Sequence, residues 1–262
     1  MRGGPEKREN PAVELSGTVC LVTGATSGIG RATAVALGEA GADVLVSGRD
    51  EAALAAVAAE ANGRALPCDL AEPGAGGRLA ADALAACGRV DVLVNCAGVG
   101  QFGPAAALTP DDVERVLRIN VSAPIDLTSA LLPGMLARQQ GHVVNLGSIL
   151  GRVGHRREAV YAASKAAIAI FSDSLRDELR GTGVSVSLIS PGAVDTPFFA
   201  RRGAPYDRRW PAPVEPARIA AAIVRAVGGN RAETFVPAWL SIAVRVRRLA
   251  PGLYRVLAGR FG

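Results

Sequence analysis

The sequence TGATSGIG at residues 23–30 decides the fold. It follows an apolar segment of strand-like composition, Val19–Val22, and precedes a helix-like segment from about Gly30 to Ala40. Glycines allow a tight turn and let the backbone approach a phosphate group, while the start of the helix supplies free N–H groups. A strand, a glycine-rich turn and a helix in this order therefore predict a phosphate-binding βα unit.

Strand-like and helix-like segments continue to alternate after this unit. Further strands are predicted at Val44–Ser47, Arg64–Cys68, Val90–Asn95, His142–Leu146, Val184–Ser190 and Thr234–Val236, and helices at Glu51–Ala61, Gly77–Cys87, Pro110–Gln139, Ala159–Arg180 and Glu215–Val227. Hydrophobic residues make up 49% of the chain and aromatic residues only 4%, which favours parallel strands under alanine-rich helices. We therefore predict an α/β fold, a Rossmann-type doubly wound parallel sheet of about seven strands with helices on both faces, in a single domain.

Composition and charge divide the chain into three regions. We expect a flexible N-terminal arm at residues 1–15, the α/β domain at residues 16–237 and a basic amphipathic tail at residues 238–262. The arm lacks the apolar core of a secretory signal, and no run of about 18 apolar residues occurs, so a cytoplasmic protein is expected. The net charge is only +5, without basic clusters interleaved with aromatic residues, so no nucleic-acid partner is expected. Four cysteines without a Cys-x-x-Cys pair, and two histidines, predict no metal site.

Further motifs follow the glycine-rich turn in a fixed order. Asp69 follows the third strand, Asn95-Cys96-Ala97-Gly98 follows the fourth, and Ser148 follows the fifth. Tyr161 and Lys165 form a Tyr-x-x-x-Lys pair, and Pro191-Gly192 with Thr196 ends the series. Together with the TGxxxGxG spacing, this set resembles the short-chain dehydrogenase/reductase family over roughly residues 16–236. Two departures are Cys96, where the family has a second Asn, and the absence of a glycine-rich closing segment.

The resemblance implies hydride transfer between a nicotinamide dinucleotide and a carbonyl or alcohol carbon. The catalytic residues that it implies are Asn120, Ser148, Tyr161 and Lys165. The residues that it implies for cofactor binding are Gly24, Ser27, Gly28, Ile29, Gly30, Arg49, Asp69, Leu70, Asn95, Ala97, Gly98, Tyr161, Lys165, Pro191, Gly192, Val194 and Thr196. In this family, the backbone carbonyl of the residue that matches Asn120 holds a water in a proton relay through the lysine.

The chemistry of the pair can also be argued from the residues themselves. Tyr161 and Lys165 are four residues apart in a helical segment, so they share one face. A phenol has a pKa near ~10, and we expect a nearby ammonium and the positive charge of an oxidised nicotinamide to lower it. Ser148 can hydrogen-bond the substrate oxygen and hold it against Tyr161. Pro124 has no N–H to donate to the carbonyl of Asn120, so the long helix should kink there.

The end of the second strand indicates which dinucleotide binds. Gly48 stands where NAD-using members of the family carry an acid, and Arg49 follows it, able to bind a 2′-phosphate. NADP is therefore favoured, with NAD as the alternative. The other interpretation of Arg49 is a solvated side chain paired with Asp50 or Glu51.

The substrate is less determined than the reaction. Phe102, Phe198 and Phe199 suggest an apolar pocket for a lipid-like, steroid or aromatic ketone. A 3-oxoacyl thioester and a sugar are the polar alternatives, and a non-catalytic dinucleotide-sensing protein is a remote one. We expect a homodimer or homotetramer built through the two long helices, as in the family.

The tail carries a second pattern. Ile242, Val246, Leu249, Leu253 and Leu257 are spaced as one helical stripe, with arginines around it and a break at Pro251-Gly252. We favour a helix that packs this stripe on the domain or a neighbouring subunit, with the arginines in solvent. The alternative is a basic amphipathic element on an anionic membrane surface.

Overall fold

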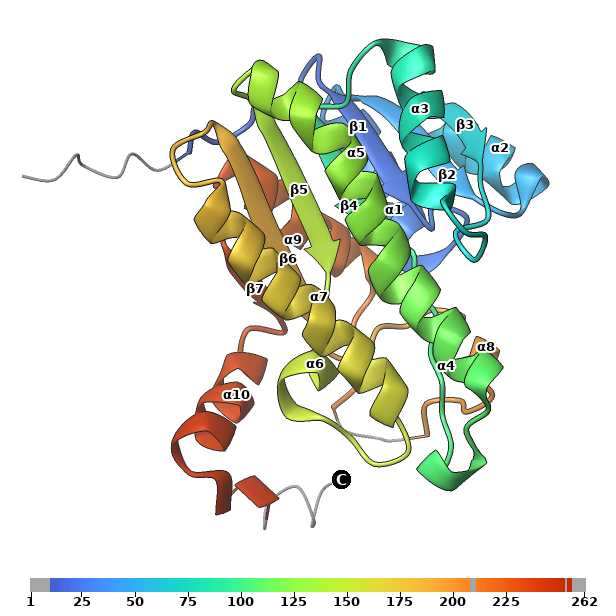
Figure 1. Ribbon diagram of the computed structural model, residues 1–262, viewed down its shortest axis with the longest axis vertical. Helices are drawn as coiled ribbons and strands as arrows, with labels where there is room; N and C mark the ends of the chain where they lie inside the picture. The colour runs from blue at the N-terminus through green and yellow to red at the C-terminus, as the bar shows by residue number, and fades with distance from the viewer. Residues whose placement is uncertain (1–9, 208–210, 253, 256–262) are drawn as a thin grey trace, which may run out of the picture.

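Seven parallel strands form one sheet in the order β3-β2-β1-β4-β5-β6-β7, as the alternation predicts (Figure 1). The computed structural model describes residues 10–207, 211–252 and 254–255. The strands are β1 (Val19–Thr23), β2 (Asp43–Gly48), β3 (Arg64–Pro67), β4 (Val92–Asn95), β5 (Gly141–Leu146), β6 (Val184–Pro191) and β7 (Glu233–Val236). Their order reverses between β1 and β4, and ligands of doubly wound sheets bind outside the carboxyl ends at that point.

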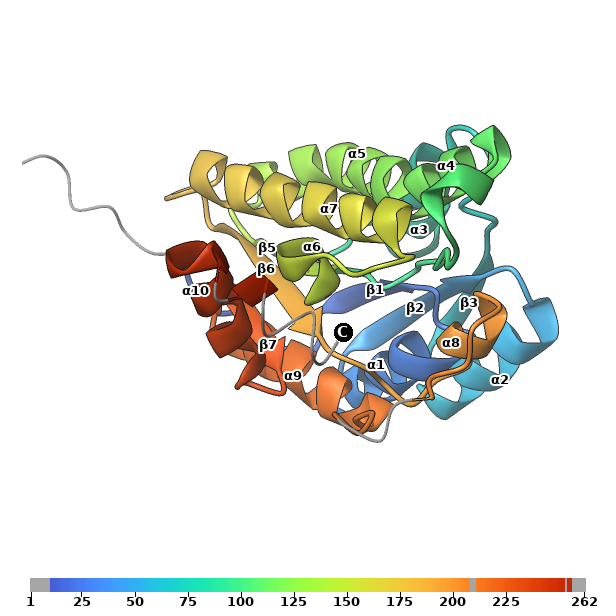
Figure 2. The ribbon, with the colours of Figure 1, turned by 90° about the horizontal axis from the view of Figure 1, so that it is seen from below.

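Helices cover both faces of the sheet (Figure 2). One face carries α3 (Ala75–Cys87), α5 (Ala123–Ala137) and α7 (Ala159–Glu178), and the other carries α1 (Gly28–Glu39), α2 (Glu51–Glu60) and α9 (Pro216–Gly228). The shorter helices are α4 (Pro110–Leu117), α6 (Leu150–Val153), α8 (Phe198–Arg201) and α10 (Leu240–Leu249). Figure 1 places α6, α8 and α10 toward the end of the sheet where the strand arrows point, so they surround the carboxyl edge.

The core has two halves because side chains alternate across each strand. In β1, Val19 and Leu21 belong to the cluster under α3 and α5, while Cys20 and Val22 belong to the cluster under α1 and α9. Every residue of β1 is buried, as expected of a parallel strand between two helical layers. The sheet is therefore held rigidly, and its carboxyl ends form a fixed platform for the loops.

The segment predicted as one long helix, Pro110–Gln139, is divided at Asn120. The helix α4 ends at Leu117, a π-helical segment spans Arg118–Ser122, and α5 begins at Ala123. Pro124 cannot supply the N–H that an α-helix would donate to the carbonyl of Asn120, so the regular ladder is lost there. The regular α-helix is thus interrupted at the residue where a kink was expected, and the interruption takes a π-helical form that was not expected.

The first residues of the domain correct one expectation. We expected residues 1–15 to be a flexible arm, but Val13 and Leu15 are buried in the core, and residues 1–9 lie outside the described part. Asn10 is fastened to the turn between α7 and β6: its amide donates to the carbonyls of Leu179 and Val184, and its oxygen accepts from the N–H groups of Gly181 and Gly183. Residues 10–15 are therefore part of the domain.

The tail begins as predicted with a helix. The helix α10 ends at Leu249, just before Pro251, where the sequence predicts a break. Leu253 and Leu257 of the predicted stripe lie outside the described residues. Within the part of the chain that the structure describes, no helix combines the length and apolar character needed to cross a bilayer.

The Asn10 contacts generate a prediction for stability. We expect Asn10→Ala to lower the free energy of unfolding by about 2 kcal/mol. Four backbone groups lose a hydrogen bond that contributes about 1 kcal/mol each, and water then replaces part of that loss. Denaturant unfolding measures this loss. Gln140→Ala, at an exposed residue near the end of α5, is the control and should change stability little. Equal stabilities of the two variants would show that Asn10 does not anchor the segment.

Candidate active site

The glycine-rich turn after β1 lies directly against the turn after β4. The Thr23 hydroxyl accepts hydrogen bonds from the N–H groups of Cys96 and Ala97, both at 3.1 Å. A Cβ on Gly24 would lie 2.7 Å from the Cα of Ala97, and a Cβ on Gly30 would lie 2.2 Å from the carbonyl oxygen of Gly24. Glycine is therefore required at both positions, because any side chain would force the turns apart.

The segment after β6 folds back over the same turn. Gly28 has a φ of +55°, and a Cβ there would lie 2.8 Å from the methyl group of Thr196. Ser27 is the N-cap residue of α1, but its hydroxyl caps no helical N–H and instead accepts a hydrogen bond from Arg201 at 3.0 Å. The structure thus brings the predicted cofactor residues Ser27, Gly28 and Thr196 together, and it adds the guanidinium of Arg201.

Three of the four catalytic candidates meet at the carboxyl edge of β5. Tyr161 and Lys165 lie on the first turns of α7, and both are buried, with 8% and 4% of their surface exposed. Ser148 follows β5, and its side chain forms a hydrogen bond with Tyr161. The ammonium of Lys165 lies 6.0 Å from the centre of the Tyr161 ring and donates to the carbonyl of Leu146 at 2.8 Å. The predicted proximity of the three side chains is therefore confirmed.

Burial sets the protonation of this pair. It raises the pKa of Tyr161 to about 12, against the opposing effects of the Ser148 hydrogen bond and the nearby Arg202. It also lowers the pKa of Lys165 to about 8. We expected a depressed tyrosine pKa; the protein alone raises it, because desolvation of the phenolate outweighs the neighbouring charges. The phenol is therefore protonated at neutral pH and can act as a proton donor.

Two predicted asparagines have different surroundings. Asn120 is 1% exposed: its amide donates to the carbonyl of Val99 and the hydroxyl of Ser164, and its oxygen accepts from the N–H of Val99. This excludes a solvent-facing Asn120 and joins the π-helical segment to α7 and to the turn after β4. The side chain of Asn95 instead donates to Thr128 and Asn145, so it faces the helical layer rather than the carboxyl edge.

Arg49 lies near the position predicted for the adenosine. Its guanidinium is 3.7 Å from the carboxylate of Asp69, and its side chain is 63% exposed. Asp50 caps α2 through the N–H of Ala53, so the expected alternative pairing of Arg49 with Asp50 or Glu51 is not what the structure has. A Cβ on Gly48 would lie 2.6 Å from the methyl group of Thr26, so a side chain there would displace that of Thr26.

The remaining cofactor candidates line the same edge. A Cβ on Gly98 would lie 3.4 Å from the ammonium of Lys165, and a Cβ on Gly192 would lie 3.0 Å from Leu240 of α10. Leu70 and Val194 are buried, and Ile29 is partly buried against the core. The carbonyl of Pro191 accepts from the N–H of Ile149 at 2.9 Å, which joins the segment after β6 to the one after β5.

A buried ion pair, which the sequence analysis missed, closes the loop after β6 over the site. Arg202 pairs with Glu158 at 2.5 Å, and the two side chains are only 7% and 6% exposed. The guanidinium of Arg202 also lies over the rings of Phe102 and Phe199, 5.0 Å and 4.7 Å from their centres. Because Glu158 stands three residues before Tyr161, the pair joins the loop to the start of α7.

Phe198 brings the same loop to the reactive group. Its ring centre lies 5.4 Å from that of Tyr161 and 5.7 Å from that of Phe199. The rings of Tyr161, Phe198 and Phe199 therefore form one aromatic cluster. The sequence does show that Arg202 and Glu158 carry opposite charges and lie on two segments expected near the pocket. It contains no signal that these two residues pair with each other.

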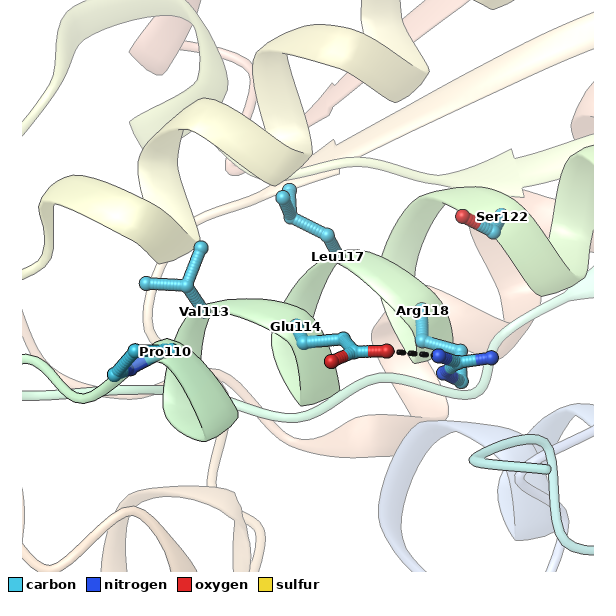
Figure 3. Close-up of a pocket in the computed structure, with 6 residues that line it drawn as sticks. All are labelled: Pro110, Val113, Glu114, Leu117, Arg118 and Ser122. Carbon is cyan, nitrogen blue, oxygen red and sulfur yellow. Dashed lines mark hydrogen bonds and ion pairs between the residues drawn. The ribbon is translucent and has the colours of Figure 1, made fainter. Parts of the chain in front are cut away.

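A separate groove of about 590 Å³ lies along α4 (Figure 3). Its lining residues are Pro110, Val113, Glu114, Leu117, Arg118 and Ser122, none of them a predicted site residue. Glu114 and Arg118 form an ion pair across successive turns in this groove. Among the described residues, no three His, Cys, Asp or Glu side chains gather as metal ligands would.

Comparison with known proteins agrees with this geometry. A family model described as short chain dehydrogenase matches residues 18–207. The chain therefore belongs to the short-chain dehydrogenase/reductase family, a class of oxidoreductases. The resemblance seen in the ordered motifs is confirmed.

Similar proteins cover nearly the whole chain. The chain is 37% identical to dehydrogenase/reductase SDR family member 7B of Mus musculus, over 94% of this chain and 82% of the mouse protein. It is 34% identical to a metagenomic short-chain oxidoreductase solved in complex with NADP, over 85% of this chain and 98% of that one, with a TM-score of 0.74. A short-chain dehydrogenase/reductase from Burkholderia phymatum in complex with NAD is 26% identical, over 92% and 96%, with a TM-score of 0.82.

The buried ion pair generates a second prediction. We expect Arg202→Met to lower the free energy of unfolding by roughly 3–5 kcal/mol, because it leaves the buried Glu158 carboxylate with only His155, at 3.5 Å, in place of the arginine. Denaturant unfolding measures the loss, and replacing both residues by apolar ones should recover much of it.

Arg157→Met is the matched control. Arg157 also lies over the Phe102 ring, at 4.7 Å, but is exposed, and losing such a contact costs about 0.5–1 kcal/mol. Equal losses in Arg202→Met and Arg157→Met would mean that the ion pair does not hold the loop.

Proposed function

We propose that this protein is an NADP(H)-dependent oxidoreductase that interconverts a carbonyl and a secondary alcohol, with Tyr161 as the acid and base. The observation that carries the proposal is the buried arrangement of Ser148, Tyr161 and Lys165 beside the glycine-rich turn. The family membership supports the reaction class. A binding protein without catalysis is the remote alternative, and the presence of all four catalytic candidates, Asn120 included, argues against it.

The chain offers a cradle that fits a dinucleotide. Gly24, Gly28 and Gly30 leave the turn without side chains, and the start of α1 directs its N–H groups to the same place. The pyrophosphate would lie there, the adenosine beside Asp69 and Leu70, and the nicotinamide end between Gly98, Lys165 and the segment from Pro191 to Thr196, including Val194. Contacts of Ile29, Asn95 and Ala97 would come from their backbones. A bound nicotinamide supplies or accepts the hydride.

The side chains of the site would handle the proton. Ser148 and Tyr161 would both hydrogen-bond the substrate oxygen, and Tyr161 would donate its proton as the alkoxide forms. In the reverse direction the phenolate is needed, and the positive charges of Lys165 and of an oxidised nicotinamide would favour it against burial. Lys165 would also hydrogen-bond the cofactor ribose.

Asn120 would complete the proton path. Its side chain is fully used in holding Val99 and Ser164, so its contribution would come from the backbone carbonyl. Pro124 has no N–H for that carbonyl, which leaves it available to hold a water next to Lys165. The π-helical segment at Arg118–Ser122 marks the same loss of the regular α-helical ladder around this residue.

NADP is the preferred cofactor, and NAD is the alternative. Gly48 offers no carboxylate to bind the ribose of NAD, and the exposed Arg49 can turn from Asp69 to a 2′-phosphate. Both cofactors occur in the similar structures, NADP in the metagenomic oxidoreductase and NAD in the Burkholderia phymatum protein.

The substrate we propose is an apolar ketone or its alcohol. Phe102, Phe198 and Phe199 form the aromatic wall beside Tyr161, and the charge of Arg202, which lies against two of these rings, is neutralised by Glu158. A lipid-like, steroid or aromatic ketone suits such a wall. A 3-oxoacyl thioester and a sugar are the alternatives, and a panel of ketones with NADPH, followed at the nicotinamide absorbance, distinguishes them.

We also propose assembly into a homodimer or homotetramer in the cytoplasm. The two long helical segments, α4 with α5 and α7, each expose large apolar residues: Leu117 at 37%, Leu136 at 36% and Ile170 at 60%. Exposed apolar side chains on neighbouring helices favour burial against a second copy.

The proton-transfer role gives the third prediction. Tyr161→Phe removes one oxygen and little volume, so NADPH binding should remain while turnover falls by a factor on the order of 10²–10⁴. Steady-state rates with a reducible ketone and a cofactor titration measure the two quantities. Retained turnover would assign the proton to another group and overturn the mechanism.

Cofactor choice gives the fourth prediction. Arg49→Ala should weaken NADP binding about tenfold to a hundredfold, the equivalent of roughly 1.5–3 kcal/mol for a charged hydrogen bond, and should leave NAD binding nearly unchanged. Titration of both cofactors measures this, with Arg225→Ala on α9 as a remote control. Equal weakening of NAD and NADP would show that Arg49 does not contact the 2′-phosphate.

A further inference from the structure

The first residue of α10, Leu240, is the buried one, while Ala243, Val244 and Val246 are half-buried. Leu240 is 6% exposed, and one of its methyl groups would lie 3.0 Å from a Cβ on Gly192. The helix contacts α6 and β7, and in Figure 2 it lies at the rim of the molecule, outside the helical layers. One end of α10 therefore sits beside the segment that closes the active site.

The apolar face of α10 points away from the domain. Ile242 is 59% exposed and Leu249 is 84% exposed. At 3.6 residues per turn they lie about 200° and about 180° around the axis from Leu240, opposite the buried side. We expected this stripe to pack on the domain or on a neighbouring subunit, with the arginines in solvent. Ile242 and Leu249 do not pack on the domain, whereas Val246 of the same stripe is half-buried.

Positive charge accompanies this face. Residues 238–262 contain five arginines and no Asp, Glu or Lys. Arg245 and Arg248 are exposed, and they lie about 140° and about 80° from Leu240, on one flank of the apolar face. Arg247 does not lie on this flank with Arg245 and Arg248; its guanidinium lies 5.9 Å from the centre of the Tyr254 ring.

We propose that α10 is a peripheral membrane-binding helix whose Ile242–Leu249 face enters the interface of a bilayer that contains anionic lipid. An exposed apolar face flanked by arginines, on a helix without acidic residues, has the charge and polarity that such an interface attracts. A second copy of the chain fits this face less well. A symmetric contact would bring this patch against its own copy, so that arginines of both helices would lie in one interface to which neither helix contributes an acidic residue.

The location of α10 gives this surface a role in substrate access, which rests on the proposed function. Through Leu240 it adjoins Gly192, and through α6 it adjoins the segment that follows Ser148. A protein lying on a bilayer through α10 holds the carboxyl edge of its sheet near the lipid. A lipophilic ketone dissolved in the membrane then reaches the aromatic wall at Phe198 without crossing bulk water.

Sedimentation with vesicles tests the proposal on the full chain. The wild-type protein should bind vesicles of phosphatidylcholine with phosphatidylserine, bind vesicles of phosphatidylcholine alone much less, and dissociate as salt is raised. Ile242→Asp with Leu249→Asp, and separately Arg245→Gln with Arg248→Gln, should each lower the partition coefficient tenfold or more, since each arginine near such a surface contributes about a fivefold factor.

Matched variants elsewhere separate this face from general effects. Leu84→Asp on α3 replaces another exposed leucine, and Arg218→Gln with Arg225→Gln on α9 removes the same charge from another surface. These controls should bind vesicles as the wild type does, and the α10 variants should keep wild-type activity on a water-soluble ketone.

Three results would overturn the proposal. First, the wild-type protein could fail to bind anionic vesicles. Second, the control variants could lose vesicle binding as the α10 variants do. Third, the wild type could fail to bind vesicles while the α10 variants change the oligomeric mass measured by light scattering. The last result would assign the face to a second copy of the chain. Vesicle binding is measured without substrate, so it can fail or succeed whether or not the protein reduces ketones.

Discussion

The close contact between the turns after β1 and β4 is the constraint on which the rest of the site depends. Gly24 meets Ala97 so closely that a Cβ would lie 2.7 Å from the neighbouring Cα, and Thr23 ties the two backbones together. This contact sits where the strand order reverses, so it shapes the crevice. The phosphate-binding turn and the catalytic edge of β5 are then held at a fixed separation by the buried strands between them.

Buried polar side chains connect the sheet to α7, the helix that holds Tyr161 and Lys165. Asn120 links the turn after β4 to Ser164 on α7, and Asn145 links β5 to Ser172 on the same helix. Such groups cost free energy unless each finds a partner, so their hydrogen bonds select one arrangement of α7 on the sheet. The register of α7 in turn places Tyr161 next to Ser148. Stability and catalytic geometry thus rest on the same contacts.

Much of this architecture follows from local rules. Alternating strand and helix signals predict the doubly wound sheet, and TGATSGIG with the Tyr-x-x-x-Lys pair predicts where the crevice and its chemistry lie. The break at Asn120 also follows from covalent structure, because proline lacks an N–H. Contacts between distant segments have no such local signal. The pairing of Arg202 with Glu158, and the fastening of Asn10 to the turn before β6, arise only when the chain has folded.

The sequence by itself determined the family, the order of the motifs and the existence of an amphipathic tail. It did so because those features depend on residue type and spacing along the chain. Only the tertiary structure decided that burial raises the pKa of Tyr161, that Asn95 turns into the helical layer, and that Ile242 and Leu249 face outward. Periodicity shows that a helix has an apolar face, but which side docks on the domain depends on where its first residue, Leu240, finds a place to bury.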